Sequence, residues 1–209
     1  MTSNPGSSRI YRGVPPHGAG QKIGLFGGSF DPAHEGHRRV SLEALRRLQL
    51  DQLWWVVTPG NPLKDTHALP PLDQRVHEAA AAAAHPRIVV TGMEAELKTH
   101  FTADLIRALT KKAPATRFVW IMGSDNLAQF HRWDRWREIA GTVPMAVVNR
   151  PGALAAALSG PAAQALASYR IDEADAPRLA DKAAPAWIFL NGPRSAASST
   201  ALRSGFNAS

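Results

Sequence analysis

The stretch "GLFGGSFDPAHEGHRRV", residues 24–40, carries most of the information about the fold. An apolar segment ends in two glycines, and a polar loop then leads into a helix-like pattern that opens with two histidines. A short buried strand stopped by glycine and followed by a helix is typical of a βα unit. Glycine lets a ligand approach the backbone closely, and the free amides at the start of a helix attract anions. We therefore expect a phosphate-binding loop, with His34 and His37 as donors to the same anion.

Further along the chain, short apolar segments alternate with amphipathic ones. Strands are expected within residues 22–28, 51–62, 87–92, 116–126, 144–152 and 186–193. Helices are expected at residues 36–50, 71–86, 101–114 and 136–143, with Asp73 and Thr102 as candidate N-caps. This alternation predicts a single Rossmann-like α/β domain with a mainly parallel, twisted sheet and helices on both faces. In such a sheet, the ligand site lies beyond the carboxyl ends of the strands.

Composition places the chain among ordinary globular proteins. It has 209 residues, 44% of them hydrophobic and 20% charged, and its longest uniform run is the six alanines 79–84, too short to span a membrane. No cysteine is present, which excludes disulfides, thiolate catalysis and cysteine-ligated zinc and favours the cytoplasm. Residues 1–20 are rich in Ser, Gly and Pro and lack the apolar segment of a secretory signal, so they are interpreted as a flexible tail before a domain at 21–209. Residues 151–185 are rich in Ala and Pro and give no prediction.

Charge and spacing leave alternatives open. A net charge of +7 suits an anionic partner, but a solvated basic surface explains it equally well. The His34–His37 spacing would permit zinc, with Asp31 as the one obvious further ligand nearby. A helix N-terminus is a poor place for a cation, so we expect no protein-bound metal. Two capping histidines without a ligand are the remaining explanation of that pair.

Several motifs carry a family resemblance. "GGSFDPAHEGH", residues 27–37, resembles the signature of the HxGH nucleotidyltransferase superfamily, and "SSTALR", residues 198–203, resembles its second signature. Members transfer AMP or CMP to a phosphate-bearing acceptor and release pyrophosphate. Three further segments resemble those of bacterial-type nicotinate-nucleotide adenylyltransferases. They are "TPGNPLKD", "HFTADLI" and "IMGSDNLAQFHRWDRW", which begin at residues 58, 100 and 121.

The resemblance implies adenylyl transfer from ATP to nicotinate mononucleotide, giving deamido-NAD and pyrophosphate in NAD biosynthesis. Mg²⁺ would arrive with ATP, and no general base is needed because the second pKa of a phosphate monoester is about 6. The implied catalytic residues are His34, His37 and Arg203. The implied ATP-binding residues are Gly27, Gly28, Ser29, Phe30, His34, Gly36, His37, Gly123, Asp125, Ser198, Ser199, Thr200 and Arg203. The implied residues for the mononucleotide are Asn61, Lys64, Thr102 and Trp133, whose indole would stack on the pyridine ring.

Some residues depart from the family pattern. Leu63 and Lys64 follow Pro62 where the family usually has a PPHK-like loop, and Asp104 replaces a common threonine. The sequence also stops soon after Arg203, before the C-terminal helix usual in the family. Nicotinamide mononucleotide or phosphopantetheine remain alternative acceptors, and a basic nucleotide- or RNA-binding module is the alternative from another class. We expect ATP and nicotinate mononucleotide as partners, with no nucleic acid and no membrane, and leave the oligomeric state open.

Overall fold

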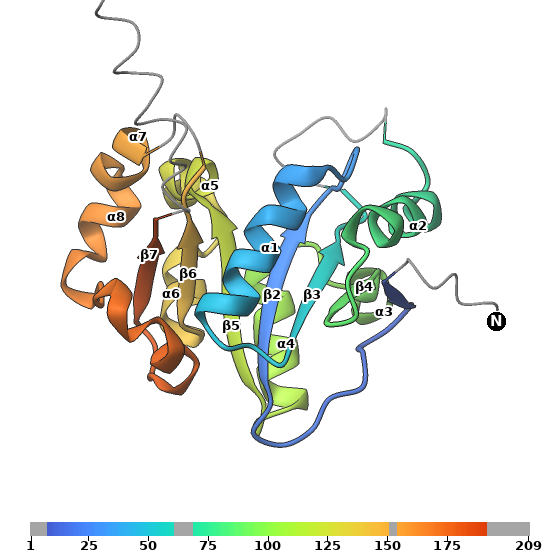
Figure 1. Cartoon of the computed structure of the whole chain (residues 1–209), viewed down its shortest axis with the longest axis horizontal. Coiled ribbons are helices and arrows are strands. Elements are labelled where there is room, and N and C mark those ends of the chain that lie inside the picture. Colours follow the sequence, from blue (N-terminus) through green and yellow to red (C-terminus); the bar gives the residue numbers. More distant parts are fainter. Residues whose placement is uncertain (1–7, 61–68, 151–153, 192–209) are drawn as a thin grey trace, which may run out of the picture.

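The computed structural model describes residues 8–60, 69–150 and 154–191, which build one seven-stranded parallel sheet covered by helices (Figure 1). The strands are β1 (Arg9–Tyr11), β2 (Lys22–Gly28), β3 (Gln52–Val57), β4 (Ile88–Thr91), β5 (Arg117–Gly123), β6 (Met145–Val148) and β7 (Trp187–Leu190). The α-helices are α1 (Glu35–Arg47), α2 (Leu72–Ala83), α3 (Met93–Leu97), α4 (Thr102–Lys112), α5 (Ser124–Gln129), α6 (Trp136–Thr142), α7 (Leu154–Ser159) and α8 (Pro161–Ala165). Short 3₁₀ helices are η1 (Phe130–Arg132), η2 (Ala167–Tyr169) and η3 (Glu173–Asp181).

The strand order places a switch point at the centre of the sheet. The order is β1-β4-β3-β2-β5-β6-β7, and every pairing is parallel. From β2 the chain builds outward to β3 and β4 on one side, and from β5 it builds outward to β6 and β7 on the other. The connections that leave β2 and β5 therefore run to opposite sides, and in sheets of this kind ligands bind at the carboxyl ends beside such a switch point.

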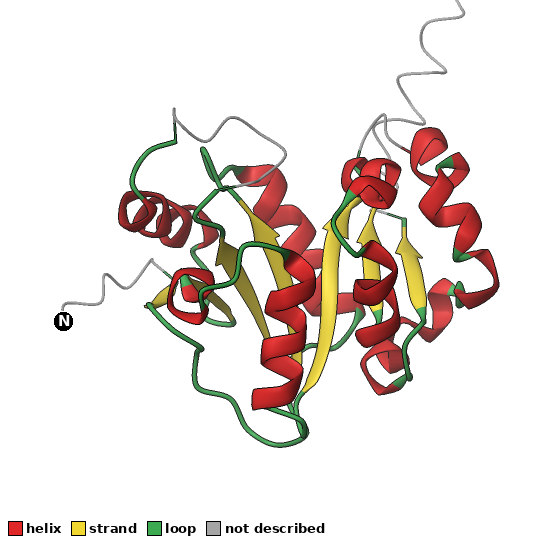
Figure 2. Ribbon diagram, turned by 180° about the vertical axis from the view of Figure 1, so that it is seen from behind, coloured by secondary structure: helices red, strands yellow, loops and turns green. Residues whose placement is uncertain are grey.

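Two hydrophobic layers enclose the sheet. Residues alternate between the layers along each central strand, so that Trp54 and Val56 face one layer while Leu53, Trp55 and Val57 face the other. Helices α1, α2 and η3 pack on the second layer. Helices α4, α6, α7 and α8 pack on the first layer. Figure 2 shows the molecule from the side opposite to that of Figure 1. The predicted fold class, a parallel α/β sheet covered on both faces, is confirmed.

The prediction for the N-terminal segment is wrong in part. Residues 1–20 were expected to be a flexible tail, but Arg9–Tyr11 form β1 and pair with Val89–Thr91 at the edge of the sheet. The hydroxyl of Ser8 also donates to the carbonyl oxygen of His85 at 3.1 Å. A three-residue strand has no periodicity that distinguishes it from a polar tail, and its pairing partner lies about 80 residues away in the sequence, as the register Arg9↔Val89 shows.

Two predicted helix caps are also wrong. Pro71 occupies the N-cap of α2, and Asp73 lies inside the first turn, where its charge still complements the helix dipole. Phe101 occupies the N-cap of α4, and Thr102 is its first helical residue, with no side-chain cap bond. Helix α3, the helix that follows β5 and the helices after residue 153 had no clear sequence signal. Within the described residues, no helix is long and apolar enough to cross a membrane.

Candidate active site

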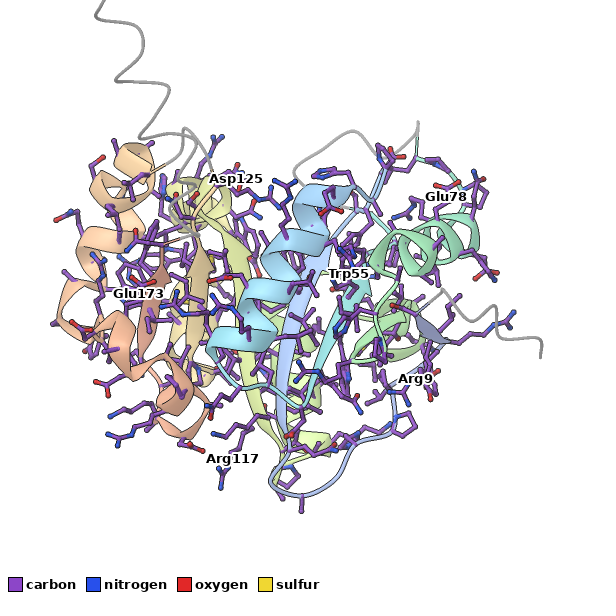
Figure 3. All side chains as sticks on the ribbon, in the orientation of Figure 1. Arg9, Trp55, Glu78, Arg117, Asp125 and Glu173 are labelled. Atoms are coloured by element: carbon purple, nitrogen blue, oxygen red, sulfur yellow. The ribbon has the colours of Figure 1, made fainter. Side chains whose placement is uncertain are left out.

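The residues singled out in the first loop gather at the switch point between β2 and β5. Gly27 and Gly28 end β2, and Gly123 ends the neighbouring β5. Figure 3 shows Asp125 at this end of the molecule and Arg117, which begins β5, at the opposite end. The residues named as candidates in the first loop and after β5 therefore lie at the carboxyl ends of two neighbouring strands, at the point where the strand order reverses.

Position 27 has little room for a side chain. A Cβ atom there would lie 2.7 Å from Cη2 of Trp120 on β5. The indole of Trp120 is buried and its ring lies 6.2 Å from that of Trp133. Gly27 thus lets the aromatic cluster of the β5 side approach the loop that follows β2.

The two histidines cap helix α1 and each other. The Nδ1 atom of His34 accepts the N–H of Gly36 at 3.0 Å, and Nδ1 of His37 accepts the N–H of His34 at 3.3 Å. Gly36 makes room for this cap, because a Cβ atom there would lie 2.8 Å from Cε1 of His34. Since both Nδ1 atoms are acceptors, each neutral ring carries its proton on Nε2. The capping explanation and the donor prediction are therefore compatible: the cap orients the rings and leaves Nε2–H for a ligand.

His37 stays neutral at physiological pH. Burial lowers its pKa to about 4, and the nearby rings and charges of His34 and Arg150 act in the same direction. Its ring centroid lies 3.9 Å from that of His34 and 4.9 Å from that of Phe30. A neutral imidazole in this setting donates one hydrogen bond, and an arriving polyphosphate would raise its affinity for a proton.

Phe30 supports the loop from inside. Its side chain is buried and stacks on Trp55 with ring centroids 4.8 Å apart, so only its backbone remains available to a ligand. Its backbone has a φ of 48°, a conformation that costs energy in a non-glycine residue and is found where the surrounding structure enforces it. Ser29, the residue before it, has its carbonyl oxygen turned inward to Arg75 at 2.8 Å.

After β5, Asp125 pairs with a residue that sequence reasoning missed. Nη1 of Arg150 lies 3.3 Å from Oδ2 of Asp125, and the N–H of Arg150 donates to Oγ of Ser124 at 2.9 Å. A Cβ atom at Gly123 would lie 2.3 Å from Oδ1 of Asp125 and 2.9 Å from Nε of Arg150, so glycine lets this pair lie against the end of β5. Nε of Arg150 is buried and has no hydrogen-bond partner among the described residues. Asp125 is not a helix cap, since Gly123 holds that position. The available signal was the place of Arg150 near the end of the expected strand segment 144–152, in "NRPG", two residues past the observed end of β6.

Two of the residues expected on the acceptor side, Thr102 and Trp133, come from adjoining segments. Asp104, in the first turn of α4, accepts hydrogen bonds from both terminal nitrogens of Arg135, at 2.8 and 2.7 Å. These bonds lower the pKa of Asp104 and hold the start of α4 against the segment that carries Trp133. Trp133 is half-buried, with its ring 5.4 Å from that of Phe130, so part of the indole packs on the core. The structure brings Thr102 and Trp133 into neighbouring segments, with the indole more buried than its polar sequence context suggested.

A buried carboxyl group lies behind the loop that follows β3. Glu94 is 6% exposed, and its Oε2 has no hydrogen-bond partner among the described residues. Burial raises its pKa to about 7, and the hydroxyl of Thr58 opposes that shift, although this hydroxyl itself donates to the carbonyl oxygen of Gly60 at 3.0 Å. No sequence pattern had pointed to Glu94, because a single acid in a short helix has no distinctive spacing.

Six predicted site residues lie outside the described ranges 8–60, 69–150 and 154–191. They are Asn61, Lys64, Ser198, Ser199, Thr200 and Arg203. Within those ranges, no three His, Asp or Glu side chains come together in a way that would hold a metal ion.

Comparison with known proteins gives concordant results. Residues 25–205 match the family described as cytidylyltransferase-like. A probable nicotinate-nucleotide adenylyltransferase of Methylorubrum extorquens is 60% identical over 182 residues, which cover 87% of this chain and 98% of the relative. The protein of the same name from Rhizobium meliloti is 55% identical over 182 residues, with 87% and 97% covered.

A solved structure shares the fold. Nicotinic acid mononucleotide adenylyltransferase of Plasmodium falciparum, complexed with NaAD, superimposes with a TM-score of 0.57 at 18% identity. The match covers 83% of this chain and 76% of that one. At this identity the likeness supports the fold alone.

Proposed function

Since the chain belongs to the cytidylyltransferase-like family, we propose that it transfers the adenylyl group of ATP to nicotinate mononucleotide in NAD biosynthesis. The products are deamido-NAD and pyrophosphate. The observation that carries the proposal is the 60% identity over 98% of a relative that bears this name. The predicted resemblance to nicotinate-nucleotide adenylyltransferases is thereby confirmed.

The reaction is an in-line displacement at the α-phosphorus of ATP. A phosphate oxygen of the mononucleotide forms the new P–O bond, and the bond from the α-phosphorus to the bridging oxygen breaks, so that pyrophosphate leaves with the electron pair. The attacking phosphate is already ionised, and catalysis consists of positioning and charge stabilisation. This chemistry suits a site that has oriented N–H donors and no covalent nucleophile.

On the ATP side, we assign the phosphates to the loop between β2 and α1. The Nε2–H groups of His34 and His37 would donate to phosphate oxygens, together with the amides at the start of α1. Arg150 lies just past the carboxyl end of β6, paired with Asp125, and supplies a permanent positive charge there. Asp125 would accept from the adenosine moiety once Arg150 is shared with the nucleotide. Ser198, Ser199, Thr200 and Arg203 remain proposed contacts of the β- and γ-phosphates.

On the acceptor side, the exposed part of Trp133 would stack on the pyridine ring, with Thr102 near the nicotinate carboxylate. Stacking of this kind contributes about 0.5–1.5 kcal/mol beyond simple burial. Asn61 and Lys64 remain proposed contacts of the mononucleotide.

The described residues fit a magnesium ion that binds together with ATP. The exposed carboxylate of Asp125 is engaged by Arg150, and no acidic cluster exists in the described ranges. Mg²⁺ held mainly by phosphate oxygens and water neutralises polyphosphate charge without needing such a cluster. The cytoplasm, expected from the sequence, is the proposed compartment.

Purified protein tests the proposal directly. With Mg²⁺, ATP and nicotinate mononucleotide it should release pyrophosphate and form deamido-NAD in equal amounts, measured by a coupled phosphate assay and by chromatography. Parallel reactions with nicotinamide mononucleotide and phosphopantetheine identify the acceptor. Folded protein that releases pyrophosphate with phosphopantetheine and with neither pyridine mononucleotide would overturn the assignment.

A further inference from the structure

Arg75 is the one arginine among the largest fully buried side chains of the described residues. It lies in the first turn of α2, its side chain is 1% exposed, and α2 packs on the same face of the sheet as α1. Within the described ranges, no carboxylate lies within 4.0 Å of its guanidinium group. A buried arginine without an ion-pair partner is costly unless its donors are satisfied, so its hydrogen bonds explain why it is tolerated.

Four backbone carbonyl oxygens satisfy Arg75. Nη1 donates to Ser29 and to Thr58, both at 2.8 Å, Nη2 donates to Pro59 at 3.1 Å, and Nε donates to Pro70 at 2.9 Å. These bonds use four of the five N–H groups of a guanidinium. The two N–H groups of Nη1 therefore join two different loops.

The joined loops belong to the two halves of the proposed site. Ser29 lies in the donor-side loop, residues 29–34, which carries His34 into α1. Thr58 and Pro59 lie in the acceptor-side loop, residues 58–60, which follows β3. Their parent strands β2 and β3 pair directly, up to Gly28↔Val57, but the backbone bond from the N–H of Thr58 to Gly28 is the last contact of that ladder. Beyond it, among the described residues, the hydrogen bonds of Arg75 join the two loops.

Arg75 also sets the direction of two peptide groups. In a trans peptide the C=O and the following N–H point in opposite directions. Carbonyl groups of Ser29 and Pro59 turned toward Arg75 therefore turn the N–H groups of Phe30 and Gly60 away from it. Neither N–H has a hydrogen-bond partner within the described ranges, and an N–H without a protein partner is satisfied by water or a ligand. One guanidinium thus turns one amide in each loop away from itself, and neither amide is bonded within the part of the chain that the structure describes.

The positive charge of Arg75 also favours ligand binding at the two loops. Burial lowers the pKa of Arg75, and the carboxylate of Asp31 in the donor-side loop partly offsets this, so the side chain stays cationic at neutral pH. A positive charge behind both loops favours the anionic ligands that each would receive.

We propose that Arg75 is a positioning residue that couples the two halves of the site. It holds the donor-side and acceptor-side loops at a fixed spacing and presents the free N–H groups of Phe30 and Gly60 to the phosphates of ATP and of the mononucleotide. The inference rests on the proposed function for the identity of these ligands.

The test is Arg75→Met, which keeps the length and apolar stem of the side chain and removes every donor. Because one side chain holds both loops, KM should rise for ATP and for nicotinate mononucleotide together, and kcat/KM should fall by about 10²-fold, the scale of a 1 Å misplacement. Binding of each ligand alone, measured by calorimetry with a non-hydrolysable ATP analogue and with nicotinate mononucleotide, should weaken in parallel. Turnover of the wild-type enzyme tests the proposed function separately.

Two variants serve as matched controls. Val76→Ala truncates the next, buried residue of α2, so it should lower the melting temperature without changing either KM. Arg87→Met removes an exposed arginine that donates to the carbonyl oxygen of Leu50 at 3.1 Å, at the amino end of β4, and should leave both KM values within about twofold.

If Arg75→Met does not fold, Arg75→Lys replaces it. Lysine keeps the charge but reaches fewer of the four carbonyl oxygens, so both KM values should rise less and still together. Folded Arg75 variants with both KM values and both dissociation constants within twofold of wild type would overturn the proposal. A change in KM and in the dissociation constant for only one of the two ligands would overturn the proposed coupling.

Discussion

His37→Ala tests the proposed mechanism at its centre. The substitution removes the ring whose Nδ1 accepts the N–H of His34 at 3.3 Å and whose centroid lies 3.9 Å from the ring of His34. It also removes the Nε2–H that this cap leaves available to a ligand. The cap bond and the donor are therefore lost together, but they affect different measurements.

The two losses differ in size. Loss of a preorganised donor to a transition state lowers kcat by about 10²–10³-fold, or roughly 3–4 kcal/mol. Loss of one ordinary hydrogen bond costs about 1 kcal/mol of folding stability. For a chain of this size, that corresponds to a fall in melting temperature of about 2–4 °C. His37→Ala should thus be a folded protein with a large kinetic defect.

Initial-rate kinetics at pH 7.5 with both substrates varied, together with thermal melts, separate the two effects. His77→Ala is the matched control because His77 also lies on a helix and its Nδ1 is 2.7 Å from a carbonyl oxygen, that of Asp73, but it faces solvent on α2. The control should have wild-type kcat and a comparably small change in melting temperature.

A His37→Ala enzyme with wild-type kcat and a melting temperature a few degrees lower would refute the mechanism. That result would assign His37 to helix capping alone. A kinetic defect equal in His37→Ala and His77→Ala would point to a nonspecific effect of the substitutions and would refute the argument equally.

The structure leads to three other predictions, for Trp133, Glu94 and the N-terminal segment. Trp133→Ala should raise KM for nicotinate mononucleotide by several-fold, with that for ATP almost unchanged, because stacking contributes about 0.5–1.5 kcal/mol; steady-state kinetics would contradict this if only the ATP value moved. Glu94→Gln should melt at a higher temperature than wild type at pH 8, with the gap closing toward pH 5. Its carboxyl pKa is raised to about 7, so the wild type loses stability as pH rises from 4.5 through 7, and a pH-independent gap in melting temperature would count against this. Deletion of residues 1–20 should lower the melting temperature by several degrees because it removes β1; calorimetry showing an unchanged transition would mean that β1 contributes nothing to stability.

Local sequence determined the central part of the fold. The apolar runs that end in Gly-Gly, Thr-Pro-Gly and Gly-Ser-Asp predicted β2, β3 and β5 correctly, because buried parallel strands need continuous apolar residues and their turns need glycine or polar caps. The same local pattern placed His34 and His37 at the start of α1. Motif resemblance supplied the expected chemistry, including residues such as Arg203 and Lys64 that lie outside the described ranges.

Tertiary structure decided what depends on residues distant in sequence. The strand order put Gly123 and Asp125 at the carboxyl end of β5, beside the strand that leads to the histidines, and the edge pairing with β4 made a strand of residues 9–11. In the sequence, Arg75 is one polar residue of an amphipathic helix. In the folded structure, its guanidinium bonds to Ser29, 46 residues away. Hydrogen bonds within a turn or a helix depend on residues that are neighbours in the sequence, so a local sequence pattern predicts them. Bonds such as those of Arg75 form only where the packed sheet and helices bring separate loops to one buried point.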